Sequence, residues 1–155
     1  MTSSQHGRIL GIDAGERRIG VAISDPGGSF ALPLDSILAD GSELERLAEL
    51  IERESVSDLV VGLPLSLSGE ASDQTERARA FAARAEQRLG LPVHMWDERL
   101  SSHEAERLTS RDRDDRRRGE RRGGRSNRQG GADTDALAAS IILQAYLDSL
   151  RFERI

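Results

Sequence analysis

Acidic side chains at three separate places in the chain have the chemistry to bind a metal ion together. Asp13 follows the largely apolar stretch 9–12, the pair Asp97 and Glu98 follows the stretch 93–96, and Asp135 lies on the apolar face of a helical pattern. Carboxylate oxygens without sulfur ligands select Mg²⁺ or Mn²⁺, and one or two such ions in a carboxylate cluster hydrolyse phosphodiester bonds. The residue types therefore predict a metal-dependent phosphodiesterase centre.

Each acidic residue also has a simpler structural interpretation when it is considered alone. Asp13 lies in a glycine-containing turn, where an aspartate often accepts hydrogen bonds from its own backbone. Asp97 or Glu98 would suit the start of a following helix, and Asp135 would suit the positive end of its helix dipole. Strand alternation places Asp97 and Glu98 on opposite faces, so only one of the two can share a given face. The combination of the three places favours the metal site.

The pattern of the first forty residues predicts three antiparallel strands. Residues 8–13 and 19–24 alternate on either side of the turn at 14–16, which is typical of a hairpin. A third strand is expected from about Phe30 to Leu38, after the Asp-Pro-Gly-Gly turn at 25–28.

The rest of the pattern alternates helices with strands. We expect a helix from about residue 42, capped by Asp40 or Ser42, a buried strand at 59–61, a helix from about Ser72 to Leu89 and a strand at 93–96. A short helix is expected at 102–109, and a last helix from about Asp133, its N-cap, to Leu150. Strand-helix-strand units pair in parallel. This order predicts one α/β domain over 1–155 with an RNase H-like fold and a mixed five-stranded sheet.

The basic residues are distributed in a way that the net charge of −5 does not reveal. All 22 are arginine, and residues 111–129 contain nine arginines against four acidic residues, a local charge of +5. The stretch 111–131 contains no apolar residue, so it is expected to be a mobile loop that contacts phosphates. The expected nucleic-acid contacts are Arg17, Arg18, Arg99, Arg116, Arg117, Arg118, Arg121 and Arg122. Arg77, Arg84 and Arg88 are instead interpreted as a solvated helix face, because Glu76 and Glu86 lie between them.

Several classes of protein are excluded or disfavoured by composition. The chain contains no cysteine, which excludes disulfides and thiolate metal sites. Its start has no basic and apolar leader pattern, and no apolar run approaches the length of about 20 residues that spans a bilayer. We therefore expect a soluble, cytoplasmic protein with no membrane partner, and one with few aromatic residues for stacking bases.

Four short motifs in a fixed order span nearly the whole chain. They are GIDAG at 11–15 running into RRIGVAISD at 17–25, then VGLP at 61–64, then DERLSS at 97–102 with EA at 104–105, and finally DALAA at 135–139 with ILQ at 142–144. They resemble the motifs of the YqgF, or RuvX-like, family of nucleases, including its DERLTT-x-EA signature. Where that family usually has a lysine-rich stretch before the last helix, this chain has the longer arginine- and glycine-rich stretch.

The resemblance implies an RNase H-like fold related to Holliday-junction resolvases, and a role in trimming the 5′ end of pre-16S rRNA during ribosome biogenesis. Position by position, it implies Asp13, Glu98 and Asp135 as the catalytic residues that bind Mg²⁺ or Mn²⁺. The implied partner is RNA, free or on the pre-ribosome, with branched DNA as the alternative. A monomer and a homodimer are both compatible with the sequence.

Three other functions are weighed against this one. A Holliday-junction-type DNA resolvase would use the same carboxylates, and a non-catalytic ribosome assembly factor would keep the fold and the arginines without turnover. A nucleotide-binding phosphotransferase is the weakest of the three. An aspartate-glycine hairpin also opens the actin and sugar-kinase fold, but those enzymes clamp nucleotide between two such domains, and 155 residues fit one.

Deletion of residues 116–125 tests the predicted loop. Because the loop arginines are expected to contact phosphates, the deletion should weaken RNA binding and flatten its salt dependence, since each phosphate contact contributes about 0.7 to 0.9 to the slope. Thermal stability should stay nearly unchanged, because nothing in the segment can pack in a core. Binding isotherms over a salt series measure this, and an unchanged slope would exclude the role.

Overall fold

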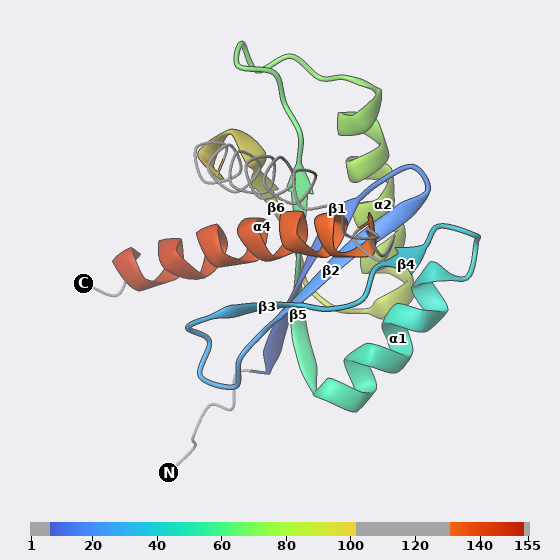
Figure 1. Ribbon diagram of the computed structural model, residues 1–155, viewed down its shortest axis with the longest axis vertical. Helices are drawn as coiled ribbons and strands as arrows, with labels where there is room; N and C mark the ends of the chain where they lie inside the picture. Colours follow the sequence, from blue (N-terminus) through green and yellow to red (C-terminus); the bar gives the residue numbers. More distant parts are fainter. Residues whose placement is uncertain (1–6, 102–130, 154–155) are drawn as a thin grey trace, which may run out of the picture.

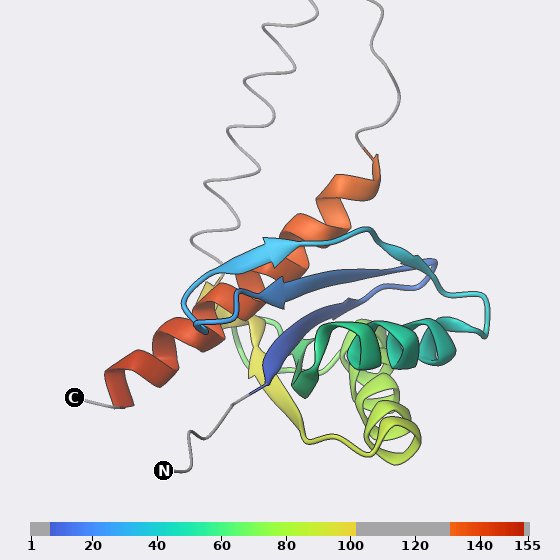
Figure 2. The same ribbon diagram turned by 90° about the horizontal axis from the view of Figure 1, so that it is seen from below.

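The computed structural model of the chain describes residues 7–101 and 131–153, and Figures 1 and 2 show how its elements are arranged. The strands are β1 (Arg8–Ala14), β2 (Arg18–Ser24), β3 (Ala31–Pro33), β4 (Ile37–Leu38), β5 (Val56–Leu63) and β6 (Val93–Asp97). The helices are α1 (Glu43–Glu54), α2 (Asp73–Leu89), the 3₁₀ helix η1 (Glu98–Ser101) and α4 (Gly131–Glu153). The predicted helix at 102–109 and most of the predicted loop lie outside the described residues.

The strands form one mixed sheet in the order β3-β2-β1-β5-β6, which confirms the predicted fold class. The predicted third strand is divided, because β3 and β4 both pair with β2 but at different places along it. Pro33 ends β3, and proline, which has no N–H to donate, is tolerated in a sheet at such an edge position. The sheet therefore has six strands rather than the predicted five, with β3 and β4 sharing one edge.

Three of the strands run in parallel and end together. β1 pairs with β5 through Ile12 and Val61, and β5 pairs with β6 through Gly62 and Trp96. The carboxyl ends of parallel strands meet at the same end of a sheet, where open α/β sheets bind their ligands. We call this place the carboxyl end of the sheet, and it is where β1 reaches Asp13 and β6 reaches Asp97.

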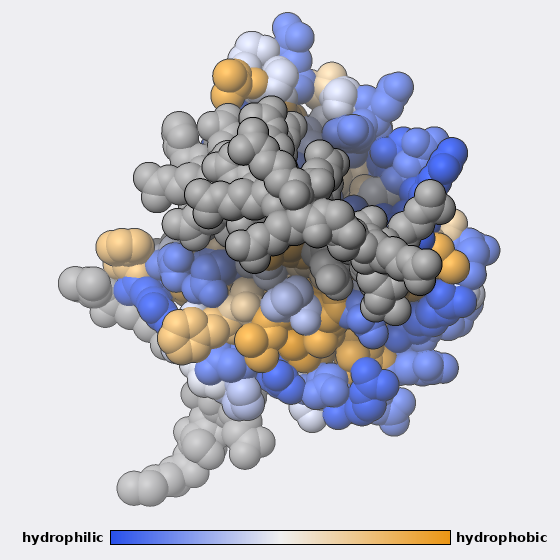
Figure 3. Space-filling model, viewed as in Figure 1, coloured by the Kyte–Doolittle hydropathy of each residue, from blue (hydrophilic) through white to orange (hydrophobic). Residues whose placement is uncertain are grey.

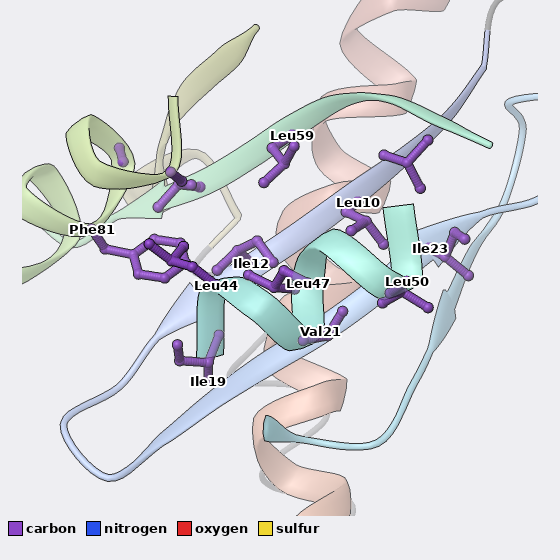
Figure 4. Packing of buried hydrophobic residues seen from close by; sticks show 14 of the residues in the cluster. Leu10, Ile12, Ile19, Val21, Ile23, Leu44, Leu47, Leu50, Leu59 and Phe81 are labelled. Atoms are coloured by element: carbon purple, nitrogen blue, oxygen red, sulfur yellow. The ribbon is translucent and has the colours of Figure 1, made fainter. Parts of the chain in front are cut away.

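Helices cover both faces of the sheet, with α1 and α2 on one face and α4 on the other (Figure 2). Strand alternation sends apolar side chains of β1, β2 and β5 toward α1 and α2. There they pack against Leu44 and Leu47 of α1 and Phe81 of α2, as Figure 4 shows. A smaller apolar cluster packs under α4 around Ala139, Ile142 and Leu143. The larger core therefore lies on the face away from α4.

The helix ends follow their local sequence. Ser72 caps α2, and its hydroxyl and that of Thr75 accept each other's backbone N–H, while Gly90 ends the helix in a left-handed conformation. Ser42 occupies the N-cap position of α1, one of the two predicted places. The last helix begins at Gly131, two residues before the predicted start, so Asp133 lies in its first turn rather than at its cap.

The helix α4 lies unusually close to the hairpin of β1 and β2. A Cβ atom added to Gly20 of β2 would lie 2.0 Å from the backbone oxygen of Asp135, in the first part of α4. Because Gly20 pairs with Asp13 across the hairpin, this contact brings the backbone of Asp135 over the end of β1. Within the two described ranges, no helix has an apolar stretch long enough to cross a membrane.

Substitution of Gly20 tests this close approach. Gly20→Ala should lower the free energy of unfolding by about 1–3 kcal/mol or more, because overpacking forces backbone shifts. Gly27→Ala is the control, since the nearest atom to its added Cβ would be an Asp25 side-chain oxygen at 3.2 Å. Urea unfolding measures both variants, and equal losses of stability would contradict the dependence of α4 on position 20.

Candidate active site

The first of the predicted acidic residues, Asp13, lies at the carboxyl end of β1 and is largely buried. Because side chains alternate along a strand, Asp13 lies on the same face of β1 as Gly11 and Ile9, which is the face covered by α4. Leu10 and Ile12 lie on the other face and belong to the larger core. Burial, and after it repulsion from Asp135, raise the pKa of Asp13 to about 6. An acidic group in this setting favours either a proton or a cation.

The second, Asp135, comes from α4 and lies beside the first. Its backbone rests on Gly20, the residue that pairs with Asp13. The two carboxylates are close enough for Asp135 to raise the pKa of Asp13. Asp135 is partly buried, as expected for a residue on the inner face of the helix.

The third, Glu98, is the first residue of η1 and lies directly after β6. A Cβ atom on Gly62 of β5 would lie 2.8 Å from the Oε1 atom of Glu98, so the glycine makes room for the carboxylate. Burial, and after it the charges of Asp13 and Asp97, raise the pKa of Glu98 to about 7. Gly62, on the strand between β1 and β6, therefore leaves space for the Glu98 carboxylate to approach Asp13.

Asp97, the neighbour that the sequence left as an alternative to Glu98, binds an arginine instead. Both of its oxygens accept hydrogen bonds from the Nε atom of Arg99 at 3.0 Å, and its Oδ2 accepts one from Nη2 at 2.6 Å. These bonds hold the pKa of Asp97 below its usual range. The geometry therefore favours Glu98 over Asp97 as the partner of Asp13.

Asp13 is the common member of two interacting pairs, because it is coupled electrostatically both to Asp135 and to Glu98. In the part of the chain that the structure describes, no three acidic or histidine side chains are already arranged to hold a metal ion. The donor set nevertheless fits Mg²⁺ or Mn²⁺, because it consists of hard oxygen ligands. It also fits because two of the carboxylates are destabilised by burial and mutual repulsion, which a cation would relieve.

The predicted nucleic-acid contacts fall into three groups. Arg17 and Arg18 are exposed at the hairpin turn that follows Asp13, near the candidate site. Arg99 forms an ion pair with Asp97, and its Nη1 atom would lie 3.4 Å from a Cβ added to Gly69, so the side chain extends to the loop after β5. The five arginines of the predicted loop, from 116 to 122, lie outside the described residues.

A hollow in the described ranges lies away from the carboxylates. It has a volume of about 980 Å³ and opens at the opposite end of the sheet, among residues such as Arg8, Ser24, Asp58 and Arg151. Its charged groups have partners within the protein, as in the 2.8 Å ion pair of Arg8 with Glu54 and the 2.9 Å contact of Asp58 with His94. The volume of a hollow is therefore no guide to the position of the acidic site in this protein.

The pH dependence of stability tests the setting of Asp13. Because its pKa rises from 3.8 to about 6 on folding, the folded state holds a proton that the unfolded chain releases between these values. The wild type therefore loses stability as pH rises from about 4 to about 6. Asparagine is neutral throughout, so Asp13→Asn should be more stable above about pH 6, by on the order of 2 kcal/mol, and equal below about pH 4.

Urea unfolding in EDTA over this pH range makes the measurement. Asp35→Asn is the matched control, because Asp35 is an exposed aspartate between β3 and β4. The control should follow the wild type at every pH. A variant at position 13 that is destabilised at pH 7 would show that the carboxylate is satisfied without a cation.

The sequence of the chain matches a family model and named relatives. The family model RuvX, described as Holliday junction resolvase, matches residues 7–149. A protein of Koribacter versatilis named "Putative pre-16S rRNA nuclease" is 44% identical over 154 residues, which cover 98% of this chain and 94% of that protein. A protein of Pelotomaculum thermopropionicum with the same name is 42% identical, over 92% of this chain and 87% of that protein.

Among solved structures, T. thermophilus RuvC in complex with Holliday junction substrate matches with a TM-score of 0.55 at 17% identity, over 93% of this chain and 96% of that chain. At this identity the likeness bears on the fold alone, and it confirms the predicted RNase H-like class. The family match and the two relatives confirm the resemblance drawn from the four motifs. The chain belongs to the RuvX family.

Proposed function

We propose that the chain is a metal-dependent nuclease that matures the 5′ end of pre-16S rRNA, with Asp13, Glu98 and Asp135 as its catalytic and metal-binding residues. One observation carries the proposal. Asp13 of β1 interacts electrostatically with Glu98 of η1 and with Asp135 of α4 at the carboxyl end of the sheet, and burial and repulsion raise the pKa of Asp13 and Glu98. Acidic groups with pKa values raised in this way cluster at functional sites.

The residues around the three carboxylates have distinct tasks in this proposal. Bound Mg²⁺ or Mn²⁺ would activate water and stabilise negative charge on the phosphate and the leaving oxygen. Arg99 holds Asp97, and this fixes the turn from which Glu98 projects toward Asp13. Arg17 and Arg18 are exposed at the turn beside Asp13 and would bind phosphates next to the cleaved bond.

RNA is the proposed substrate because the two relatives reported above are both named for pre-16S rRNA. This substrate would place the protein in the cytoplasm, where ribosomes are assembled. A DNA resolvase is the second candidate function, and the description of the family model favours it. The same carboxylates would serve both, so the substrate must be settled by comparing cleavage of precursor RNA with cleavage of a four-way DNA junction.

Removal of one carboxylate tests the nuclease proposal. Asp13→Asn and Glu98→Gln should each lower the rate of Mg²⁺- or Mn²⁺-dependent cleavage of precursor RNA by more than about 100-fold. Mutation of a residue that hydrogen-bonds to a metal ligand already lowers metal affinity or activity by about 10- to 100-fold, and mutation of a ligand itself should lower them further. Cleavage is followed on gels with end-labelled RNA, and circular dichroism confirms that each variant is folded.

Asp35→Asn is again the control and should cut at the wild-type rate. If the wild type binds the RNA but cuts neither RNA nor the junction with either metal, the chain is an assembly factor rather than a nuclease. If Glu98→Gln cuts normally while Asp97→Asn does not, the assignment of the third carboxylate is wrong.

A further inference from the structure

A second hollow lies beside the turn that follows Asp13. It has a volume of about 240 Å³ and opens between the hairpin turn, the start of α1 and the face of α2. Its polar lining consists of Glu16 from the turn, Glu43 from α1, and Arg77 and Arg84 from α2. Figure 1 shows the hairpin turn close to α2. Figure 3 shows the opposite face of the molecule, on the side of α4, where apolar residues are bordered by hydrophilic ones.

Most arginines of α2 are neutralised by glutamates. Arg79 pairs with Glu76 at 3.1 Å, and Arg88 pairs with Glu45 at 3.3 Å. Arg84 lies 4.0 Å from Glu43. These contacts account for the solvated face that the sequence suggested for α2.

Arg77 differs from its neighbours. It is partly buried in the hollow, and it has no hydrogen bond or ion pair within the described ranges. Glu43 does not supply a partner, because its carboxylate accepts the N–H of Gly41 at 2.8 Å and faces Arg84. Glu16 is exposed in the turn and forms no ion pair with Arg77 there. A guanidinium that loses hydration without gaining an anion is unfavourable, so an anionic ligand is expected.

We infer that Arg77, in this hollow, binds a phosphate of the nucleic-acid strand. This phosphate would lie on the other side of the turn 14–16 from the cleaved bond. The inference rests on the proposed function for its polyanionic ligand. A strand bound at the carboxyl end of the sheet passes over the turn 14–16, which connects Asp13 to the hollow. Guanidinium binds phosphate through two parallel hydrogen bonds, and the exposed Arg17 and Arg18 add positive charge along the same turn.

Salt dependence of binding tests the inference. Arg77→Gln should remove one phosphate contact and so reduce the slope of log affinity against log salt by about 0.7 for a short single-stranded RNA. Between about 50 mM and about 200 mM salt, the ratio of wild-type to variant affinity should fall about threefold. Fluorescence anisotropy in EDTA measures binding without cleavage. Arg79→Gln, on the same helix but paired with Glu76, should keep the wild-type slope.

A slope for Arg77→Gln equal to that of the wild type overturns the inference, and so does an equal reduction in Arg79→Gln. If Arg77→Gln does not fold, the Nε–Hε NMR signal of Arg77 in the wild type decides. It should shift on addition of the RNA while that of Arg79 does not, and an unshifted Arg77 signal overturns the inference.

Cleavage with Mn²⁺ is assayed separately so that the two proposals can fail independently. An Arg77-dependent slope in a protein that cuts nothing supports the phosphate site and rejects the nuclease. Normal cleavage with a slope that does not depend on Arg77 rejects the phosphate site and supports the nuclease.

Discussion

The close approach of α4 to the β1–β2 hairpin is the constraint on which the rest of the site depends. Gly20 places no side chain beneath the carbonyl of Asp135, so the helix backbone rests directly on the strand. Because Gly20 also pairs with Asp13, one contact sets the separation between the acidic group of the helix and that of the strand. A larger residue at position 20 would therefore change the geometry of the site as well as the packing.

β1 carries apolar residues that stabilise the fold on one face and an acidic residue whose charge is unfavourable on the other. One face of β1 buries Leu10 and Ile12 in the larger core, while the other face carries Asp13. Burial and repulsion make the charged forms of Asp13 and Glu98 unfavourable, and the apolar contacts on the opposite face must offset this. Alternation along a strand thus separates the residues that hold the protein together from those proposed to act on a substrate.

Sequence periodicity was sufficient to predict the long elements, because each buries a regular apolar stripe, but it did not encode contacts between elements. It could not place the break at Pro33, since pairing at a sheet edge leaves little trace in the pattern. It could not choose between Asp97 and Glu98, because the choice depends on Arg99 turning back to bind Asp97. It assigned Arg77 and Arg84 to one solvated helix face. It could not show that Arg84 has a glutamate partner within the described ranges and Arg77 does not, because this partner, Glu43, comes from α1.

The turn at 14–16 joins the two faces of the sheet, and this explains how an acidic protein can accommodate a polyanion. Electrostatic interactions between exposed groups fade over a Debye length of about 8–10 Å at physiological salt. The net charge of −5 therefore matters less to a bound strand than the groups next to it. Along this turn those groups are Arg17, Arg18 and Arg77, with Glu16 and Glu43 as acidic neighbours, while Asp13 lies on the face of α4. A cation bound by the carboxylates would add positive charge beside this turn, next to the proposed path of the strand.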